Sequence, residues 1–281
     1  MNKGLVMDSI FSEVKAEPFT EHTNKSLYAS WNGESISRVF EPEKSLPPAA
    51  RNAYEDFQAY ISSEDFSCIG AKAALKGNLF RFGFYEEMNA PETNSLLAED
   101  LRFFAEEQKK ITTNYASFAA IFDAPCIETE ESWENALWTQ LKNLHEIDRR
   151  NFVWDSTVSD KPEDVNFSFS IGGTGFFIVG LFPHSSRKAR RFSRLAMVFN
   201  PHAQFDRLRE NGQYDRMQKT IRAREMNLQG SLNPNLSDFG TQSEARQYSG
   251  RAVEKEWKCP FHALMNSLKN QKIKIKISFS L

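Results

Sequence analysis

NFSFSIGGTGFFIVGLF, residues 166–182, is the stretch that decides the fold. Its first part alternates phenylalanine with serine, which predicts a strand with one buried face. The continuous apolar run FFIVGLF that follows is typical of an interior strand covered on both faces. Between them, Gly172 and Gly173 fit a tight strand-to-strand turn better than a phosphate-binding loop, because neither GxGxxG spacing nor a P-loop Lys-Ser/Thr is present. We therefore expect a β-sheet at the centre of the protein.

Further strand and helix patterns lie on both sides of this stretch. Apolar runs predict strands at 79–85, 115–123 and 195–200. Apolar residues recur at helical spacing in five segments, 48–63, 91–110, 132–149, 203–211 and 213–225. Ser132 is expected to cap the third of these helices. Strands and helices alternate, which predicts an α/β or α+β fold: a mixed β-sheet with flanking helices in a single compact domain.

The two ends of the chain differ in pattern from the middle. Residues 1–45 are polar and read as an irregular N-terminal arm. The folded domain is expected over 46–271. The tail, 272–281, alternates lysine with isoleucine, which predicts an edge strand with its lysines in solvent or a frayed extension.

Composition excludes several classes of protein. The chain has 281 residues, of which 40% are hydrophobic and 24 are phenylalanine, so a large core can form. Its formal net charge is −2, so any cationic site must be local and nucleic acid is not the expected partner. Three widely spaced cysteines form no disulfide framework. Neither a secretory signal nor a membrane-spanning run is present, and we expect a cytoplasmic protein with no membrane partner.

A dense group of cations follows the apolar run, in SSRKARRF (185–192). Arg187, Arg190 and Arg191 stand here beside Ser186. Such a group is commonly a solvated helix face. Arginine also binds carboxylate and phosphate oxygens through two parallel hydrogen bonds, so the cluster is a candidate site for a small anion or an anionic cofactor.

Two residues are candidate metal ligands, and each has an ordinary structural alternative. His202 follows Asn-Pro at the point where a strand should pass into a helix, and it could equally be a hydrogen-bonded structural histidine. Cys259 precedes Pro260, which predicts a helix N-terminus; such a position favours a thiolate. A buried inert cysteine is the alternative reading for Cys259. Cys68 is a third candidate.

A polar loop completes the set of candidates. Asp238, Glu244 and Arg246 lie in a segment rich in turn residues, where they could contact a cationic substrate. They could equally form Asx turns and satisfied hydrogen bonds. No triad or metal signature appears by spacing, so the catalytic residues stay unassigned at this point.

The stretch from Gly172 to Phe261 resembles the YqcI/YcgG family. The resemblance rests on the colinear motifs GGTGFFIVGL, SSRKARRF, VFNPHAQF, IRARE, LQGSLNP, DFG, SEARQYSG and WKCPF. An earlier block, CIGAKAALKGNLFRFGFY (68–85), is similar to that family's N-terminal part and extends the resemblance back to about Ala50.

The resemblance implies a haem-dependent N-oxygenase acting on a side-chain nitrogen of an amino acid, either an arginine-type guanidine or the lysine amine, in specialised metabolism. It implies haem b as cofactor, dioxygen as co-substrate and an external electron-donating reductase as partner. The iron ligand would be Cys259 or His202, and the expected helix N-terminus favours Cys259.

The resemblance also suggests roles for the charged residues. Arg187, Arg190 and Arg191, with Ser186, would bind the haem propionates. A cationic amino-acid substrate would need nearby carboxylates and an arginine for its own carboxylate; the candidates by motif are Glu225, Asp238, Glu244 and Arg246.

Two other functions stay open from the sequence. The chain could be a non-catalytic haem-binding or haem-sensing protein, or a haem-free protein that binds a small anion or nucleic acid at the arginine cluster. Substrate identity and the extent of nitrogen oxidation are not determined by the sequence, and a homo-oligomer is left open.

Overall fold

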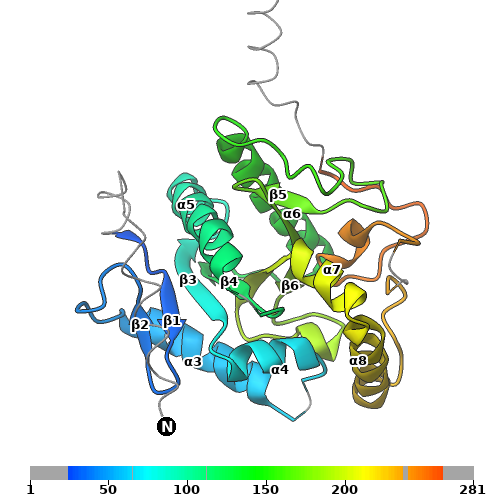
Figure 1. Cartoon of the computed structure of the whole chain (residues 1–281), viewed down its shortest axis with the longest axis horizontal. Coiled ribbons are helices and arrows are strands. Elements are labelled where there is room, and N and C mark those ends of the chain that lie inside the picture. Colours follow the sequence, from blue (N-terminus) through cyan, green and yellow to red (C-terminus); the bar gives the residue numbers. More distant parts are fainter. Residues whose placement is uncertain (1–24, 65, 112, 237–239, 262–281) are drawn as a thin grey trace, which may run out of the picture.

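A mixed seven-stranded sheet forms the centre of the computed structural model, which describes residues 25–64, 66–111, 113–236 and 240–261 (Figure 1). The strands are β1 (Ala29–Trp31), β2 (Ile36–Arg38), β3 (Phe80–Glu87), β4 (Ser117–Ala124), β5 (Phe169–Ile171), β6 (Thr174–Leu181) and β7 (Leu195–Pro201). Their order across the sheet is β2-β1-β3-β4-β7-β6-β5. Only β3 and β4 pair in parallel among these strands. The predicted fold class is confirmed.

Six helices in the described part of the chain flank the sheet. They are α3 (Pro48–Ser62), α4 (Ile69–Lys76), α5 (Pro91–Glu107), α6 (Glu130–Asp148), α7 (His202–Glu210) and α8 (Gln213–Gln229). Helices α5 and α6 cover one face, which we call the closed face. Helices α3 and α4 cover part of the other face, and α7 and α8 lie beside them (Figure 1). We call this second side the open face.

Strand alternation determines which side chains meet which helix layer, because successive residues of a strand point to opposite faces. On β7, Met197 and Phe199 pack into the core on the closed face, whereas Ala196 and Val198 belong to the cluster on the open face. The glycine turn between β5 and β6 is tight, as expected. Gly172 and Gly173 both have positive φ, at 59° and 67°, which only glycine adopts readily.

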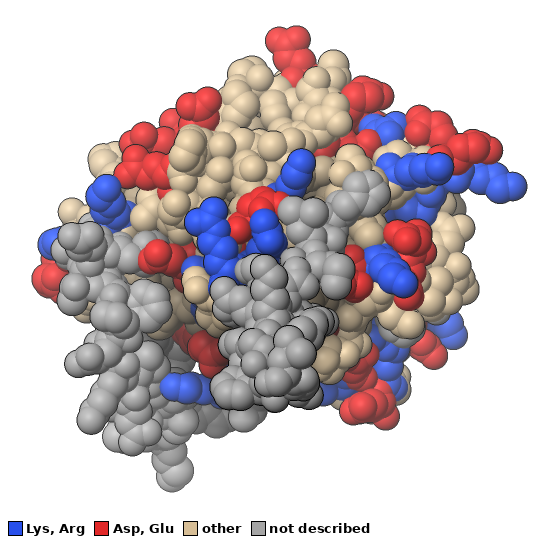
Figure 2. Space-filling view, turned by 90° about the horizontal axis from the view of Figure 1, so that it is seen from above, with Lys and Arg blue, Asp and Glu red and all other residues tan. Residues whose placement is uncertain are grey.

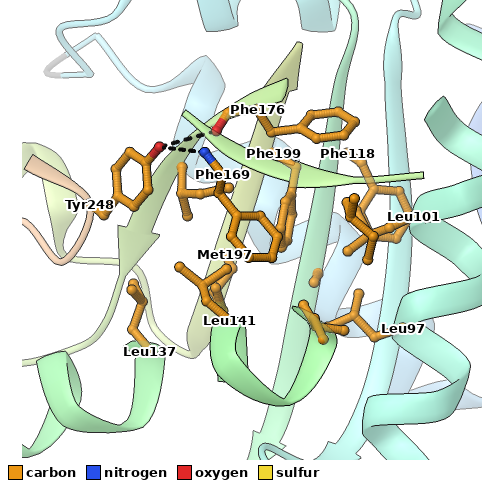
Figure 3. Close-up of a cluster of buried hydrophobic side chains, with 14 of the residues drawn as sticks. Leu97, Leu101, Phe118, Leu137, Leu141, Phe169, Phe176, Met197, Phe199 and Tyr248 are labelled. Carbon is orange, nitrogen blue, oxygen red and sulfur yellow. Dashed lines mark hydrogen bonds between the residues drawn. The ribbon is translucent and has the colours of Figure 1, made fainter. Parts of the chain in front are cut away.

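The closed face is a dense aromatic and aliphatic core (Figure 3). The predicted apolar stripe of α6 is fully buried, and so are Leu97, Leu101 and Phe104 of α5. Burying each such side chain stabilises the fold by about 2 kcal/mol. Packing against β6 is so close that a Cβ added at Gly180 would lie 2.6 Å from Leu137 Cδ1. No space for a ligand remains between α6 and this strand.

Two sequence predictions differ from the structure. Residues 25–45 are not wholly irregular, because they contain the hairpin β1–β2; strands of three residues are too short to leave an alternating pattern. Ser132 does not cap α6: the helix begins earlier, and Thr129 is the cap, accepting a hydrogen bond from the Ser132 amide.

Some predictions fall outside the described residues or stay untested. The tail 272–281 and the helix expected after Pro260 lie outside the described residues. The domain boundaries remain predictions. Among the described helices, none combines the length and apolar character needed to cross a bilayer.

Candidate functional site

A cavity of about 320 Å³ lies on the open face, between the sheet and the helices α4, α7 and α8. Its size falls at the lower end of the range for small-molecule sites. The walls are largely apolar, with Phe66, Phe80, Leu208, Met217 and Ile221 among them. Polar and charged side chains converge on this apolar space, as is typical of a ligand site.

The cavity runs along β6. Phe177, Val179 and Leu181 all line it. The four residue steps from Phe177 to Leu181 span about 13 Å of strand. Strand β7 is antiparallel to β6, so the loop after Leu181 and the residues after Pro201 lie at opposite ends of the strand pair. We call these the arginine end and the histidine end.

At the arginine end, Arg187 forms a buried ion pair with Glu225 of α8. Its Nη2 donates to Glu225 Oε2 at 3.0 Å and to the Ser231 carbonyl at 2.6 Å. Glu225 Oε1 also accepts a hydrogen bond from Ser67 Oγ at 2.5 Å. The structure therefore brings together two predicted residues, but their charges neutralise each other. Arg187 keeps one buried donor, Nε, for which the described residues offer no hydrogen-bond partner.

Arg190 lies at the same end and has a different environment. Its Nη1 donates to the Gly180 carbonyl at 3.0 Å and its Nη2 to the Gln247 carbonyl at 3.3 Å. No carboxylate within the described residues forms an ion pair with it. Burial lowers the pKa of Arg190, although an arginine stays protonated in proteins. Arg190 is thus a cavity-lining cation that an anionic group would stabilise.

At the histidine end, His202 begins α7 and faces Glu244. Its Nδ1 lies 3.8 Å from Glu244 Oε2. Glu244 is held through its other oxygen, Oε1, which accepts from Tyr248 Oη at 2.6 Å and from Ser168 Oγ at 2.7 Å. Burial raises the pKa of Glu244 to about 8 and lowers the pKa of His202. Both shifts favour the neutral forms, and a neutral imidazole is the form that binds metals.

Gln204 is a cavity residue that the sequence analysis did not single out. It is 4% exposed, and its buried Oε1 has no hydrogen-bond partner in the described part of the chain. Buried polar atoms are nearly always paired, so an unpaired one in a cavity wall requires an explanation. A glutamine within a helical pattern gives no signal on its own.

Cys68, the third ligand candidate, also lines the cavity. It is the N-cap of α4, and its sulfur accepts from the Ala71 amide at 3.5 Å. This is the arrangement that we had expected for Cys259. Burial nevertheless raises the pKa of Cys68, so the thiol form is favoured.

Cys259 does not line this cavity. It borders a second hollow, of about 820 Å³, together with Arg246 and Trp257. Burial raises the pKa of Cys259 to about 12, which favours the thiol over the thiolate. Arg246 donates to the Trp257 and Glu254 carbonyls, and its guanidinium lies 5.5 Å from the Trp257 ring centre.

Ser186 and Arg191 also lie away from the cavity lining. Ser186 bonds to Glu130 through its amide and its hydroxyl, and Arg191 Nε donates to the Ser185 carbonyl. Asp238 lies outside the described residues. The candidate residues from the sequence that share the cavity are therefore Cys68, Arg187, Arg190, His202, Glu225 and Glu244.

Two observations bear on the kind of ligand. Over the described residues, no three His, Cys, Asp or Glu side chains gather as a multidentate metal site. A haem iron requires fewer protein ligands, since the porphyrin supplies the rest. On the face drawn in Figure 2, acidic and basic side chains are interspersed, so that face offers no patch of one sign for a polyanion.

Fold and cavity together define a single-domain α/β protein with a ligand-sized cavity beside its sheet. The model of the YqcI/YcgG family matches residues 57–262, which include every residue of the cavity lining. The chain belongs to this family.

A curated protein of Streptomyces lavendulae is similar to part of the chain. Its provisional name is N(omega)-hydroxy-L-arginine synthase DcsA, and it is 26% identical over 163 residues. The match covers 56% of this chain and 60% of the relative, so the chain spans less than two thirds of that protein's length. No solved structure matches the chain significantly.

Proposed function

We propose that this protein is an N-hydroxylase that acts on a side-chain nitrogen of an amino acid, with arginine as the first candidate substrate, and that it uses haem b. The name of the Streptomyces relative supports the reaction. The observation that carries the proposal for this chain is the cavity on the open face, where a histidine whose neutral form is favoured and a buried arginine line an apolar space.

The residues of the cavity fit haem by their chemistry. His202 supplies a neutral imidazole, which is a common axial ligand of haem iron. Over the described residues, Arg190 has only carbonyl partners and the buried Nε of Arg187 has none, so both can donate to propionate oxygens. The apolar side chains suit the porphyrin faces.

We favour His202 over Cys259 as the iron ligand because His202 lies in the cavity and Cys259 does not. Bound haem would supply the activation of dioxygen. In the overall reaction, one oxygen atom enters an N–H bond of the substrate and the other leaves as water, with two electrons and two protons from an external donor. The chain's own contribution is to bind both molecules, orient the nitrogen and exclude water.

Glu244 has a separate part in this proposal. It is fixed by Tyr248 and Ser168 and directs its second oxygen toward His202 Nδ1. A carboxyl group in this place can orient the imidazole ring, as outer partners of metal-bound histidines do.

The test is direct. The purified chain is loaded with haem, then supplied with L-arginine or L-lysine, dioxygen and an electron source, and the products are analysed by mass spectrometry. The proposal predicts a Soret band and a product heavier by one oxygen atom. A protein that binds no haem and forms no such product contradicts it.

A further inference from the structure

We propose that Gln204 is a substrate-binding residue, whose side-chain carbonyl accepts a hydrogen bond from an N–H group on the substrate's side-chain nitrogen. The inference rests on the proposed function for the identity of that substrate. It adds a residue that neither the family resemblance nor the named relative assigns.

The local sequence explains why this acceptor has no partner among the described residues. Pro201 is the N-cap of α7, so His202, Ala203 and Gln204 occupy the first three helical positions. A glutamine at the third position commonly bonds back to the backbone N–H of the N-cap residue, as in a capping box. Proline has no backbone N–H, so that partner does not exist here. Gln204 Oε1 therefore stays buried and unpaired in the cavity wall.

The chemistry of the surroundings indicates what the acceptor binds. Gln204 is in the same first turn of α7 as His202, the residue proposed to bind iron. A carbonyl oxygen here can accept from an amine or guanidine N–H but offers nothing to a carboxylate. The pairing would place the nitrogen, rather than the α-carboxylate, at the histidine end. The half-buried cation at the opposite end, Arg190, suits an anionic group.

The specificity follows from the burial of Gln204. Because the residue is 4% exposed, a ligand without an N–H group leaves the carbonyl buried and unpaired. A binding site strongly rejects a ligand that leaves one of the site's own buried polar groups unpaired. We therefore expect the cavity to discriminate against amino acids whose side chain ends in a methyl group.

The experiment measures binding of L-arginine and L-lysine to the full chain by calorimetry, with and without haem. Gln204→Leu keeps the approximate size of the side chain and removes the acceptor, and we expect it to weaken binding of these probes about 10-fold or more. Gln204→Glu keeps the acceptor and should retain binding. The matched control is Gln218→Leu, which alters a half-buried glutamine that lines the same cavity from α8 and should change binding less than about 2-fold.

Thermal denaturation of each variant shows whether it is folded, and steady-state kinetics separate binding from chemistry. The inference predicts a raised KM for Gln204→Leu. If the wild type forms hydroxylated product and Gln204→Leu binds the probes as tightly, the inference is wrong and the proposed function stands. If Gln204→Leu loses binding but the wild type forms no product, Gln204 is a binding residue and the proposed function is wrong. A wild type that binds neither probe overturns both.

Discussion

The two faces of the sheet are built differently. On the closed face, α5 and α6 each bury nine residues, most of them apolar. On the open face, α3 buries five aromatic or aliphatic residues, but α7 buries three residues and α8 only Glu225, and of these last four only Leu208 is apolar. The closed face and the α3 part of the open face therefore supply stability through packing, whereas the α7–α8 part of the open face buries polar groups around a cavity. Buried ion pairs often contribute little net stability. A ligand site can hold buried polar groups for binding at the expense of stability.

The largest expected effect is on stability, when one apolar residue is truncated on each face. Leu141→Ala on the closed face should lower the free energy of unfolding by about 3 kcal/mol, because it leaves a cavity in a packed core. Ile221→Ala, on α8 beside the cavity, should cost less than about 1 kcal/mol because its side chain is only partly buried. Urea denaturation measures both. Equal losses in the free energy of unfolding would show that the α8 side of the open face is packed as tightly as the closed face.

The second prediction concerns the ion pair that attaches α8 to the open face. Glu225→Gln removes the carboxylate that pairs with Arg187, and we expect a loss of about 2 kcal/mol in the free energy of unfolding. Hydrogen exchange should accelerate in α8 more than in α5, because Glu225 is the one residue of α8 that is buried. Equal acceleration of exchange in α8 and α5 would mean that the Arg187–Glu225 ion pair does not specifically hold α8 on the open face.

The third prediction is a pH dependence that arises from Glu244. Its pKa in the folded chain is raised to about 8 from an ordinary value of 4.5, so the folded state binds its proton more tightly than the unfolded state. The resulting stability is complete below about pH 4.5 and is lost as the pH rises toward 8. Relative to Glu244→Gln, the haem-free wild type should lose up to about 1.4 kcal/mol per pH unit in this window. Parallel stability curves for the two proteins would contradict the assignment.

The sequence was most informative where a pattern repeats along one element. The apolar stripe of α6 and the run of β6 were predictable, because their periods persist over two or more turns or over a whole strand. The β1–β2 hairpin was not, since three-residue strands carry no period. The Arg187–Glu225 pair joins residues 38 apart, and no local pattern encodes such a contact.

In the site, too, residue types could be recognised from the sequence but contacts between distant residues could not. The arginine cluster and His202 could be selected by residue type. Of the cluster, however, Arg187 and Arg190 line the cavity, whereas Arg191 and Ser186 do not. The preference for Cys259 rested on a local helix-capping argument, and the helix that it requires lies outside the described residues; a thiol cap is described at Cys68. Gln204 could have been found only by combining two facts, a glutamine at the third helical position and a proline at the N-cap.

Haem binding by three proteins tests the central claim, that the functional site is the cavity on the open face. The wild type, His202→Gln and Cys259→Ala are each titrated with haem, reduced and exposed to carbon monoxide, and their Soret bands are compared. We expect the wild type and Cys259→Ala to give the same band, without the strong red shift of a thiolate ligand, and His202→Gln to lose or alter it. If Cys259→Ala loses the band and His202→Gln keeps it, the iron is bound outside this cavity and the account is wrong.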